Sequence, residues 1–290
     1  MTLCSTLKYR SLYRMLVLIL LLSVGRENIA AESLRHCLLG DNEYIESVIK
    51  LALSYSDTEY TFEVIDDYCS QVREIEFVKS GTINFMWAGT TREMEQQLRP
   101  IRIPLYKGLL GHRIFLIRNG NQSLFDQIET LADLQKIRFG QGRDWGDTSI
   151  LEAAGLTVVK SNTYPSLFQM LDSGRFEAFP RGLQEPWGEL KKWSNLPLSV
   201  EQRIALVYPM PAYLFVNKDN AALAGVFEKG LQQAIADGSF DKNFYASPSI
   251  NDALTRSNIK NRKVFRLDNP NLPRETPLDR KELWLDFADL

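Results

Sequence analysis

A glycine-rich turn at residues 140–148 carries side chains that could bind a small molecule. It follows a short apolar run and precedes a helical pattern, so backbone N–H groups at the start of that helix are free to meet a ligand. Thr148 could also bind acceptor atoms, Trp145 could stack on an apolar part of a ligand, and Arg143 could hold a carboxylate. The structural alternatives are a core tryptophan and a helix capped by Asp144 or Asp147.

The stretch around this turn alternates between strand and helix patterns. Short apolar runs at 137–139, 157–159 and 176–179 are typical of strands, and the residues between them have helical spacing. This order predicts a small α/β block with a parallel sheet. Such sheets bind ligands at the carboxyl ends of their strands, where the turn lies.

A second α/β block is predicted on either side of the first in sequence. Strands are expected at 34–39, 60–65 and 83–88, with helices between them, and further strands at 204–208 and 213–216. Two candidate crossings, near 113–118 and 203–208, flank the block described above. We therefore expect one lobe to be inserted into the other, joined by paired strands.

The first 31 residues have the outline of a signal peptide. Lys8, Arg10 and Arg14 precede an apolar run at 15–22, and Ala30 and Ala31 offer a cleavage point. The run is too short to span a bilayer as a mature helix, although an uncleaved anchor is the alternative. No cysteine lies where a lipoprotein signal needs one. We expect a soluble protein exported to a bacterial periplasm.

Charge and cysteine content limit the partners. Cleavage after Ala31 removes four of the 34 basic residues and one of the 36 acidic residues, which leaves a net charge of −5. This excess of acid argues against nucleic acid and anionic membranes as partners. Cys37 and Cys69 could form a disulfide or remain as two buried thiols. His36 and His112 have no ligand spacing, so we expect neither a metal nor a cofactor.

The order of these pieces resembles the family 3 extracellular solute-binding proteins, which capture amino acids and similar molecules for ABC importers. The resemblance implies a type 2 periplasmic-binding-protein fold, with two lobes that close on a ligand at the cleft between them. It places lobe 1 at 32–112 and 209–245, lobe 2 at 113–208, and an extension at 246–290 that packs on lobe 1. The motifs that carry it are Ala88-Gly89-Thr90-Thr91, Pro104-Leu105-Tyr106, Leu131-Ala132-Asp133-Leu134, the run from Leu171 to Phe179, and Ala236-Asp237-Gly238-Ser239-Phe240.

The resemblance also implies a set of ligand contacts. Trp87 would stack on the ligand beside Trp145, and Arg181 stands where amino-acid binders usually have an aspartate for the α-ammonium. Met94 stands where they usually have the carboxylate-binding arginine. An arginine in the cleft favours an anion, and the alternative is a structural ion pair between Arg181 and Glu185. The remaining predicted contacts are Gly89, Thr90 and Tyr106.

We therefore expect a non-catalytic, monomeric binding protein for a small polar and acidic molecule. Its partner would be an ABC permease, or a membrane sensor if the closed form signals. One enzyme alternative is a dehydratase of the cyclohexadienyl type, with Arg143 and Arg181 holding substrate carboxylates and Glu185 as the acid. Beyond residue 245, Thr276 to Asp279 has capping-box character and predicts a short amphipathic helix that includes Leu283, Phe287 and Leu290.

Overall fold

The computed structural model describes residues 31–37, 43–66 and 69–285. The predicted signal-peptide segment 1–30 lies outside these residues, as do Phe287 and Leu290. Within the described part of the chain, no helix is both long and apolar enough to cross a membrane.

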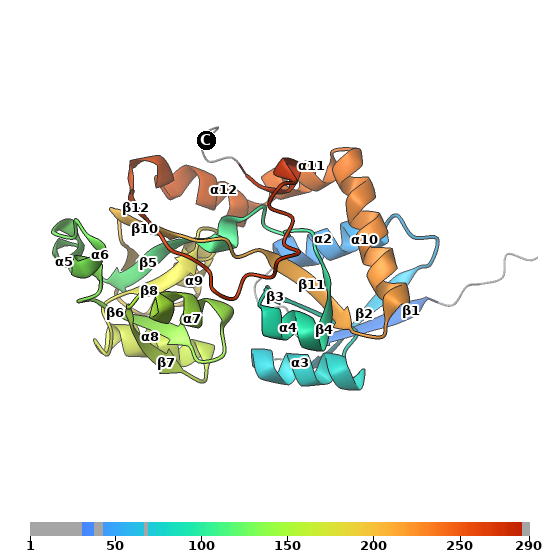
Figure 1. Cartoon of the computed structure of the whole chain (residues 1–290), viewed down its shortest axis with the longest axis horizontal. Helices are drawn as coiled ribbons and strands as arrows, with labels where there is room; N and C mark the ends of the chain where they lie inside the picture. Colours follow the sequence, from blue (N-terminus) through green and yellow to red (C-terminus); the bar gives the residue numbers. More distant parts are fainter. Residues whose placement is uncertain (1–30, 38–42, 67–68, 286–290) are drawn as a thin grey trace, which may run out of the picture.

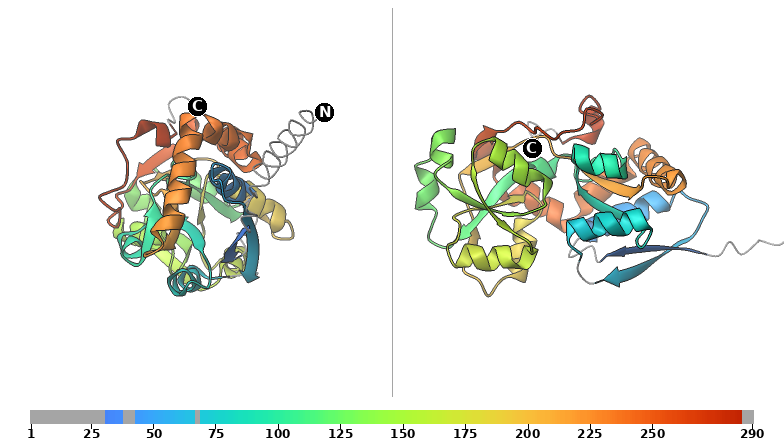
Figure 2. Two further views of the ribbon diagram at one scale, coloured as in Figure 1. Left: turned by 90° about the vertical axis from the view of Figure 1, so that its right-hand side faces the viewer. Right: turned by 60° about the horizontal axis from the view of Figure 1, so that its bottom comes forward.

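The helices and strands form two groups that lie side by side (Figures 1 and 2). The first group holds a parallel pair, β1-β2, and a three-stranded antiparallel sheet, β3-β11-β4. Its strands are β1 (Glu32–Cys37), β2 (Tyr60–Asp66), β3 (Phe85–Gly89), β4 (Leu98–Ile101) and β11 (Ala212–Asn217), and its helices are α2 (Glu43–Leu53), α3 (Gln71–Ser80), α4 (Arg92–Gln97), α10 (Ala221–Ala236) and α11 (Ser239–Ala246).

The second group is built on the order β12-β10-β5-β8, with β9 also on β5, and on the parallel pair β6-β7. Its strands are β5 (His112–Arg118), β6 (Arg138–Gly142), β7 (Thr157–Ser161), β8 (Phe179–Gly182), β9 (Leu198–Val200), β10 (Ile204–Val207) and β12 (Lys263–Arg266). Its helices are α5 (Ser123–Asp126), α6 (Leu131–Leu134), α7 (Gly146–Ala153), α8 (Tyr164–Asp172), α9 (Pro186–Lys192) and α12 (Pro248–Arg256). Over both groups, 3₁₀ turns lie at η1 (Leu109–Gly111), η2 (Ile259–Asn261) and η3 (Lys281–Leu283).

Local sequence explains where the helices beside the site begin and end. The Ser70 hydroxyl accepts a hydrogen bond from the Arg73 N–H and caps α3, and Gly81, with φ of 74°, ends it. The Thr91 hydroxyl caps α4 by accepting from the Met94 N–H. Gln71, at the start of α3, and Thr91, the cap of α4, both line the site described below.

The chain passes between the groups several times, and two of these crossings, at β5 and β10, lie against each other. β5 and β10 are antiparallel, with Leu206 opposite Arg113, and the Tyr208 N–H donates to the Gly111 carbonyl over 3.0 Å. A Cβ on Gly111 would lie only 2.1 Å from the Tyr208 carbonyl oxygen. A glycine at position 111 is therefore what allows the crossings to approach this closely.

A disulfide joins Cys37, at the end of β1, to Cys69, just before α3, with 6.1 Å between their Cα atoms. Of the two alternatives open from sequence, the structure has the bonded pair. The bond ties the parallel pair of the first group to the helix that lines the site.

Two predicted elements differ from the structure. The third strand of the second block lies at Phe179–Gly182 instead of 176–179, because pairing with β5 begins at Phe179 opposite Leu116. Arg181 is consequently inside a strand. The predicted C-terminal helix is absent from the described residues up to 285, where only the three-residue η3 forms. Thr276 is buried instead of capping, and its N–H donates to the Pro273 carbonyl.

The expectation that the extension packs on the first block also needs correction. β12 pairs in parallel with β10, so the extension adds a strand to the sheet of the second group. Its later residues contact the first group, where the Asn271 carbonyl accepts from the Arg92 N–H over 3.1 Å and the Leu285 N–H donates to the Lys107 carbonyl over 2.9 Å. The extension therefore contacts both groups, by strand pairing on the second and by individual hydrogen bonds on the first.

Candidate functional site

A hollow of about 180 Å³ lies where the two groups meet. We call it the inner hollow. Residues of β3 and α3 form one wall, and residues of β5, β8 and the start of α7 form the other. Its lining is Gln71, Glu74, Trp87, Ala88, Gly89, Leu110, Arg113, Trp145, Gly146, Asp147, Arg181, Glu185 and Met210.

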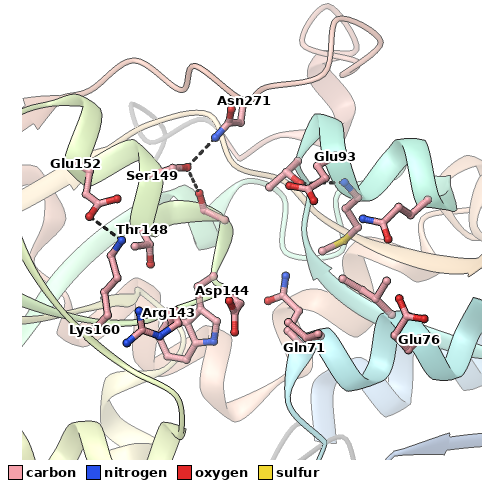
Figure 3. Close-up of a pocket in the computed structure, with 17 residues that line it drawn as sticks. Gln71, Glu76, Glu93, Arg143, Asp144, Thr148, Ser149, Glu152, Lys160 and Asn271 are labelled. Carbon is pink, nitrogen blue, oxygen red and sulfur yellow. Dashed lines mark hydrogen bonds and ion pairs between the residues drawn. The ribbon is translucent and has the colours of Figure 1, made fainter.

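A larger pocket of about 560 Å³ adjoins the hollow and shares Gln71, Trp145 and Gly146 with it. We call it the outer chamber. Figure 3 shows Gln71, Glu76 and Glu93 on one side of it and the residues that follow β6 on the other. Its lining is polar and includes Thr91, Glu93, Met94, Gln97, Arg143, Asp144, Thr148, Ser149, Glu152, Lys160 and Asn271.

Two tryptophans stand at the inner hollow, one from each group. Trp87 belongs to β3 and Trp145 directly precedes α7, and both are half-buried. The Tyr106 ring packs edge-on against Trp87 with 5.8 Å between centroids, and the Phe179 ring stacks on Trp145 at 6.2 Å. The aromatic walls are thus held in place from behind, which suits them to contact an apolar part of a ligand.

The groups touch beside these walls. A Cβ on Gly146 would lie 2.8 Å from the Thr91 methyl group, so the N-terminus of α7 meets the cap of α4 almost directly. A ligand in the inner hollow would therefore contact both groups at once.

Arg181 is buried and already paired. Its guanidinium lies 2.8 Å from a Glu185 oxygen and 2.6 Å from a Glu189 oxygen, and it also lies 5.2 Å above the Trp145 ring. Burial opposes its charge, but the two carboxylates outweigh that effect and raise the pKa of Arg181. The ion pair with Glu185 that was the structural alternative is present. Arg181 offers no unmatched charge to the hollow.

A second buried arginine, Arg113, is matched in the same way. It lies 3.0 Å from an Asp147 oxygen and 3.4 Å from a Glu185 oxygen. Asp147 is 1% exposed, and the Gln141 amide and the Tyr208 hydroxyl donate to it over 2.9 and 3.2 Å. This network accounts for the buried charge of Asp147, which lies inside α7 instead of capping it.

Glu74 lines the inner hollow as an acid that has no ion-pair or hydrogen-bond partner for its side chain among the described residues. Loss of hydration raises the pKa of this carboxyl to about 8. At neutral pH it is mostly protonated, and an incoming positive charge would favour its ionised form.

The charges around the hollow sum to an excess of acid. Arg113 and Arg181 face Asp147, Glu185 and Glu189, so the two cations are outnumbered before Glu74 is considered. Burial raises the pKa of Glu185, against the pull of Arg181. Such a site favours a ligand that brings positive charge.

The structure brings some predicted contacts together and not others. Trp87, Gly89, Trp145 and Arg181 line the inner hollow, whereas Arg143 and Thr148 line the outer chamber. Thr148 donates to the Gly142 carbonyl over 2.7 Å, and Arg143 donates to Asn162 over 2.6 Å. Those two bonds hold the glycine-rich turn in shape.

Two predicted contacts do not line either pocket. Thr90 is 1% exposed, and its hydroxyl donates to Glu95 over 2.8 Å. Tyr106 is equally buried and lies behind Trp87. The Thr90 N–H donates to the Pro211 carbonyl, just beyond the pairing of β3 with β11. A direct ligand contact by Thr90 or by Tyr106 stays a prediction.

Several lining residues were missed by sequence reasoning. Glu74 lies on a helix and Arg113 is the second residue of a strand, positions where charge usually faces solvent. Asn271 comes from the extension. Only the approach of distant segments brings them to one place. Among the described residues, no group of three potential metal ligands occurs.

Comparison with solved structures defines the fold. An ancestral arginine-binding protein bound to arginine is 20% identical, with a TM-score of 0.55 over 74% of this chain and 97% of that one. A Salmonella typhimurium periplasmic binding protein with high arginine specificity is 18% identical, with a TM-score of 0.56 over 73% and 97%. No protein-family model and no curated protein matches the sequence.

Two further solved structures represent other uses of the same architecture. One is an ancestral amino-acid-binding protein described as a precursor of cyclohexadienyl dehydratase, 14% identical with a TM-score of 0.52 over 70% of this chain and 84% of that one. The other is a histidine kinase sensor domain, 15% identical with a TM-score of 0.52 over 69% and 83%. The chain has the α/β fold of the type 2 periplasmic binding proteins, as the resemblance implied.

Proposed function

We propose that this protein binds a small polar molecule in the inner hollow and closes its two groups around it. The observation that carries the proposal is the convergence of Trp87 and Trp145, from opposite groups, on one hollow lined by buried charges. Contacts in both groups would favour the closed form, because a ligand stabilises the state in which it makes more of them.

We propose lobes that follow the sheets. Lobe 1 would comprise residues 32–112 and 209–245, and lobe 2 residues 113–208. Support comes from β11, which pairs with β3 and β4 after the chain has left the second group. The hinge would be the paired crossings at β5 and β10.

For the ligand, we propose a cationic group next to Glu74 and an apolar part between the tryptophans. The anionic ligand expected from Arg181 loses its physical basis, because Glu185 and Glu189 already match that charge. The remaining unpaired group is an acid whose pKa is raised to about 8. Two of the similar structures are described as arginine-binding, which agrees with this preference.

A thermal-shift screen of the exported protein tests both parts of this proposal. The panel should contain basic amino acids, other amino acids, amines, dicarboxylates, phosphates and sugars, since occupancy of the native form raises its melting temperature. We expect shifts only from compounds with a cationic group, and a smaller shift with Glu74→Gln. Shifts from dicarboxylates alone would restore the anionic interpretation, and no shift at all would contradict a binding function.

A dehydratase is the second candidate, favoured by one observation. Glu185 lines the hollow, and burial raises its pKa, as a general acid requires. Turnover of prephenate or arogenate by the protein, abolished in Glu185→Gln, would establish this function. Binding without turnover would exclude it for these substrates.

For the partner we propose an ABC permease or a membrane sensor, with export to the periplasm and a monomeric state. The similar structures include a binding protein of an amino-acid ABC transporter and a kinase sensor domain. Stimulation by the liganded protein of ATPase activity in a candidate permease, or of autophosphorylation in a candidate kinase, would distinguish the two.

A further inference from the structure

The C-terminal segment forms a further link between the two groups, besides the crossings at β5 and β10 and the connection from α11 to α12. After β12 it continues beside the second crossing, where the Leu267 N–H donates to the Val207 carbonyl over 2.9 Å. The Asn269 amide then donates to the Pro209 carbonyl over 2.7 Å. We call residues 267–285 the strap. Figure 1 shows it running from the second group across to the first.

The far end of the strap is anchored on the first group. Leu283 is 1% exposed, and the Leu285 N–H donates to the Lys107 carbonyl over 2.9 Å. The Lys107 ammonium donates in turn to the Glu282 carbonyl over 2.8 Å. The ring of Trp284 lies where a Cβ on Gly108 would meet it at 2.9 Å. Both ends are thus fixed, each to a different group.

Asn271 lies between these anchors, at the edge of the outer chamber. Its carbonyl accepts from the N–H of Arg92, the first residue of α4, over 3.1 Å. Its side-chain amide donates to the Ser149 hydroxyl of α7 over 2.7 Å. Figure 3 shows Asn271 above the chamber with its amide directed at Ser149. A single residue therefore bonds to both walls of the site.

This geometry resists separation of the walls. Opening the outer chamber moves α4 away from α7. Asn271 cannot stay within hydrogen-bond distance of both helices, so its bond to Arg92 or its bond to Ser149 must break. Asn269, two residues earlier, limits any compensating shift, because its side chain accepts from the Asn271 N–H over 2.9 Å while it donates to the Pro209 carbonyl.

We propose that the strap restrains opening of the two groups and that Asn271 is the positioning residue through which it acts on the ligand site. The free protein would then spend most of its time with the walls as close as they are here. Loss of the Asn271–Ser149 hydrogen bond should raise the population of open forms about fivefold, the effect of one ordinary hydrogen bond.

Distances between the groups in the unliganded protein test this directly. Gln127→Cys, beyond α5, and Glu228→Cys, on α10, are exposed positions on different groups and can carry spin labels. Double electron–electron resonance should give one narrow distance distribution for the parent protein. Asn271→Ala should add a second population at altered distance, and Ser149→Ala should add the same one.

The double variant and a matched control complete the experiment. Asn271→Ala with Ser149→Ala should add no more than either change alone, because both remove the same bond. Arg274→Ala, an exposed strap residue without a partner in the described chain, should leave the distribution unchanged. A parent-like distribution for Asn271→Ala, or an equal effect of Arg274→Ala, would overturn the proposal. Because no ligand is present, neither result depends on the proposed binding function.

Discussion

At the scale of single residues, the site is a buried network in which three carboxylates surround two arginines, with Glu74 beside it as an acid without a partner in the described chain. Arg181 forms ion pairs with Glu185 and Glu189, with N–O distances of 2.8 and 2.6 Å. Removing one member of a buried ion pair leaves its partner charged in a medium that hydrates it poorly. The network therefore positions the hollow and contributes to the stability of the second group.

Arg181→Ala should strongly destabilise the protein. Two buried carboxylates would lose their cation, at a cost of about 3–5 kcal/mol in the free energy of unfolding. Urea unfolding of the parent protein and the variant measures this loss of unfolding free energy. Lys50→Ala is the control, since its pair with Glu46 is exposed on both sides and is worth about 0–1 kcal/mol. Equal losses for the two variants would show that Arg181 is not a structural cation.

Glu74 makes stability depend on pH in a predictable direction. In the folded protein its carboxyl keeps a proton up to a pKa of about 8, whereas in the unfolded chain it ionises near 4.5. Between these values the folded state binds more protons, so this residue lowers stability as pH rises.

Glu74→Gln should remove that contribution. Unfolding free energies measured from pH 5 to pH 8 should fall less steeply with pH in Glu74→Gln than in the parent protein. Glu76→Gln makes the same substitution at an exposed position on α3 and should leave the slope as it is. An unchanged slope in Glu74→Gln would mean that the carboxyl is well hydrated.

At the scale of elements, the site depends on a close approach between strands that belong to different parts of the sequence. β5 and β10 bring the two crossings together, and Gly111 lies directly against the Tyr208 backbone. The neighbouring β8 places Arg181 beside Trp145. Small changes in these contacts should alter the angle between the groups more than the fold of either one.

Gly111→Ala should force the crossings apart. The added methyl group would overlap the Tyr208 carbonyl oxygen at 2.1 Å, which predicts a loss of about 1–3 kcal/mol in unfolding free energy. Gly188→Ala is the matched control, because no atom lies within 4 Å of its added Cβ inside α9. There we expect a gain of about 0.4–1 kcal/mol. Chemical denaturation of both variants measures these changes in unfolding free energy.

The Cys37–Cys69 disulfide should also contribute to stability, since it closes a loop with a sequence separation of 32. By the chain-entropy relation, Cys37→Ala with Cys69→Ala should cost about 3–4 kcal/mol. A reductant should lower the melting temperature of the parent protein and leave the double variant unaffected. A parent melting temperature insensitive to reductant would contradict the expectation.

At the scale of the whole molecule, the order of strands and helices could be predicted, and much of the site could not. Apolar periodicity located most elements of both groups, and local turn chemistry located Trp87 and Trp145 at strand and helix ends. Asn271 could not be predicted as a residue of the site, because its position depends on the path of a strap without regular structure. The charge balance was equally hidden, since Arg181 and Glu189 meet only after β8 and α9 have packed.

The same limit explains why Arg181, considered from the sequence alone, indicated an anionic ligand. An arginine read alone counts as a positive charge, whereas in the folded protein its neighbours decide what charge remains for a ligand. Here those neighbours are Glu185 and Glu189, and Glu74 is the group left unpaired. The whole molecule is best understood as two groups that share one hollow and are linked by the paired crossings, by the connection from α11 to α12 and by a strap.

Isothermal titration calorimetry with a compound from the thermal-shift screen tests the central claim most directly. Trp87 and Trp145 should each be needed, because a ligand held between the groups contacts both. We predict at least about tenfold weaker binding for Trp87→Ala and for Trp145→Ala, provided each variant retains its circular dichroism spectrum. Parent-like dissociation constants in both variants would contradict a ligand site in the inner hollow.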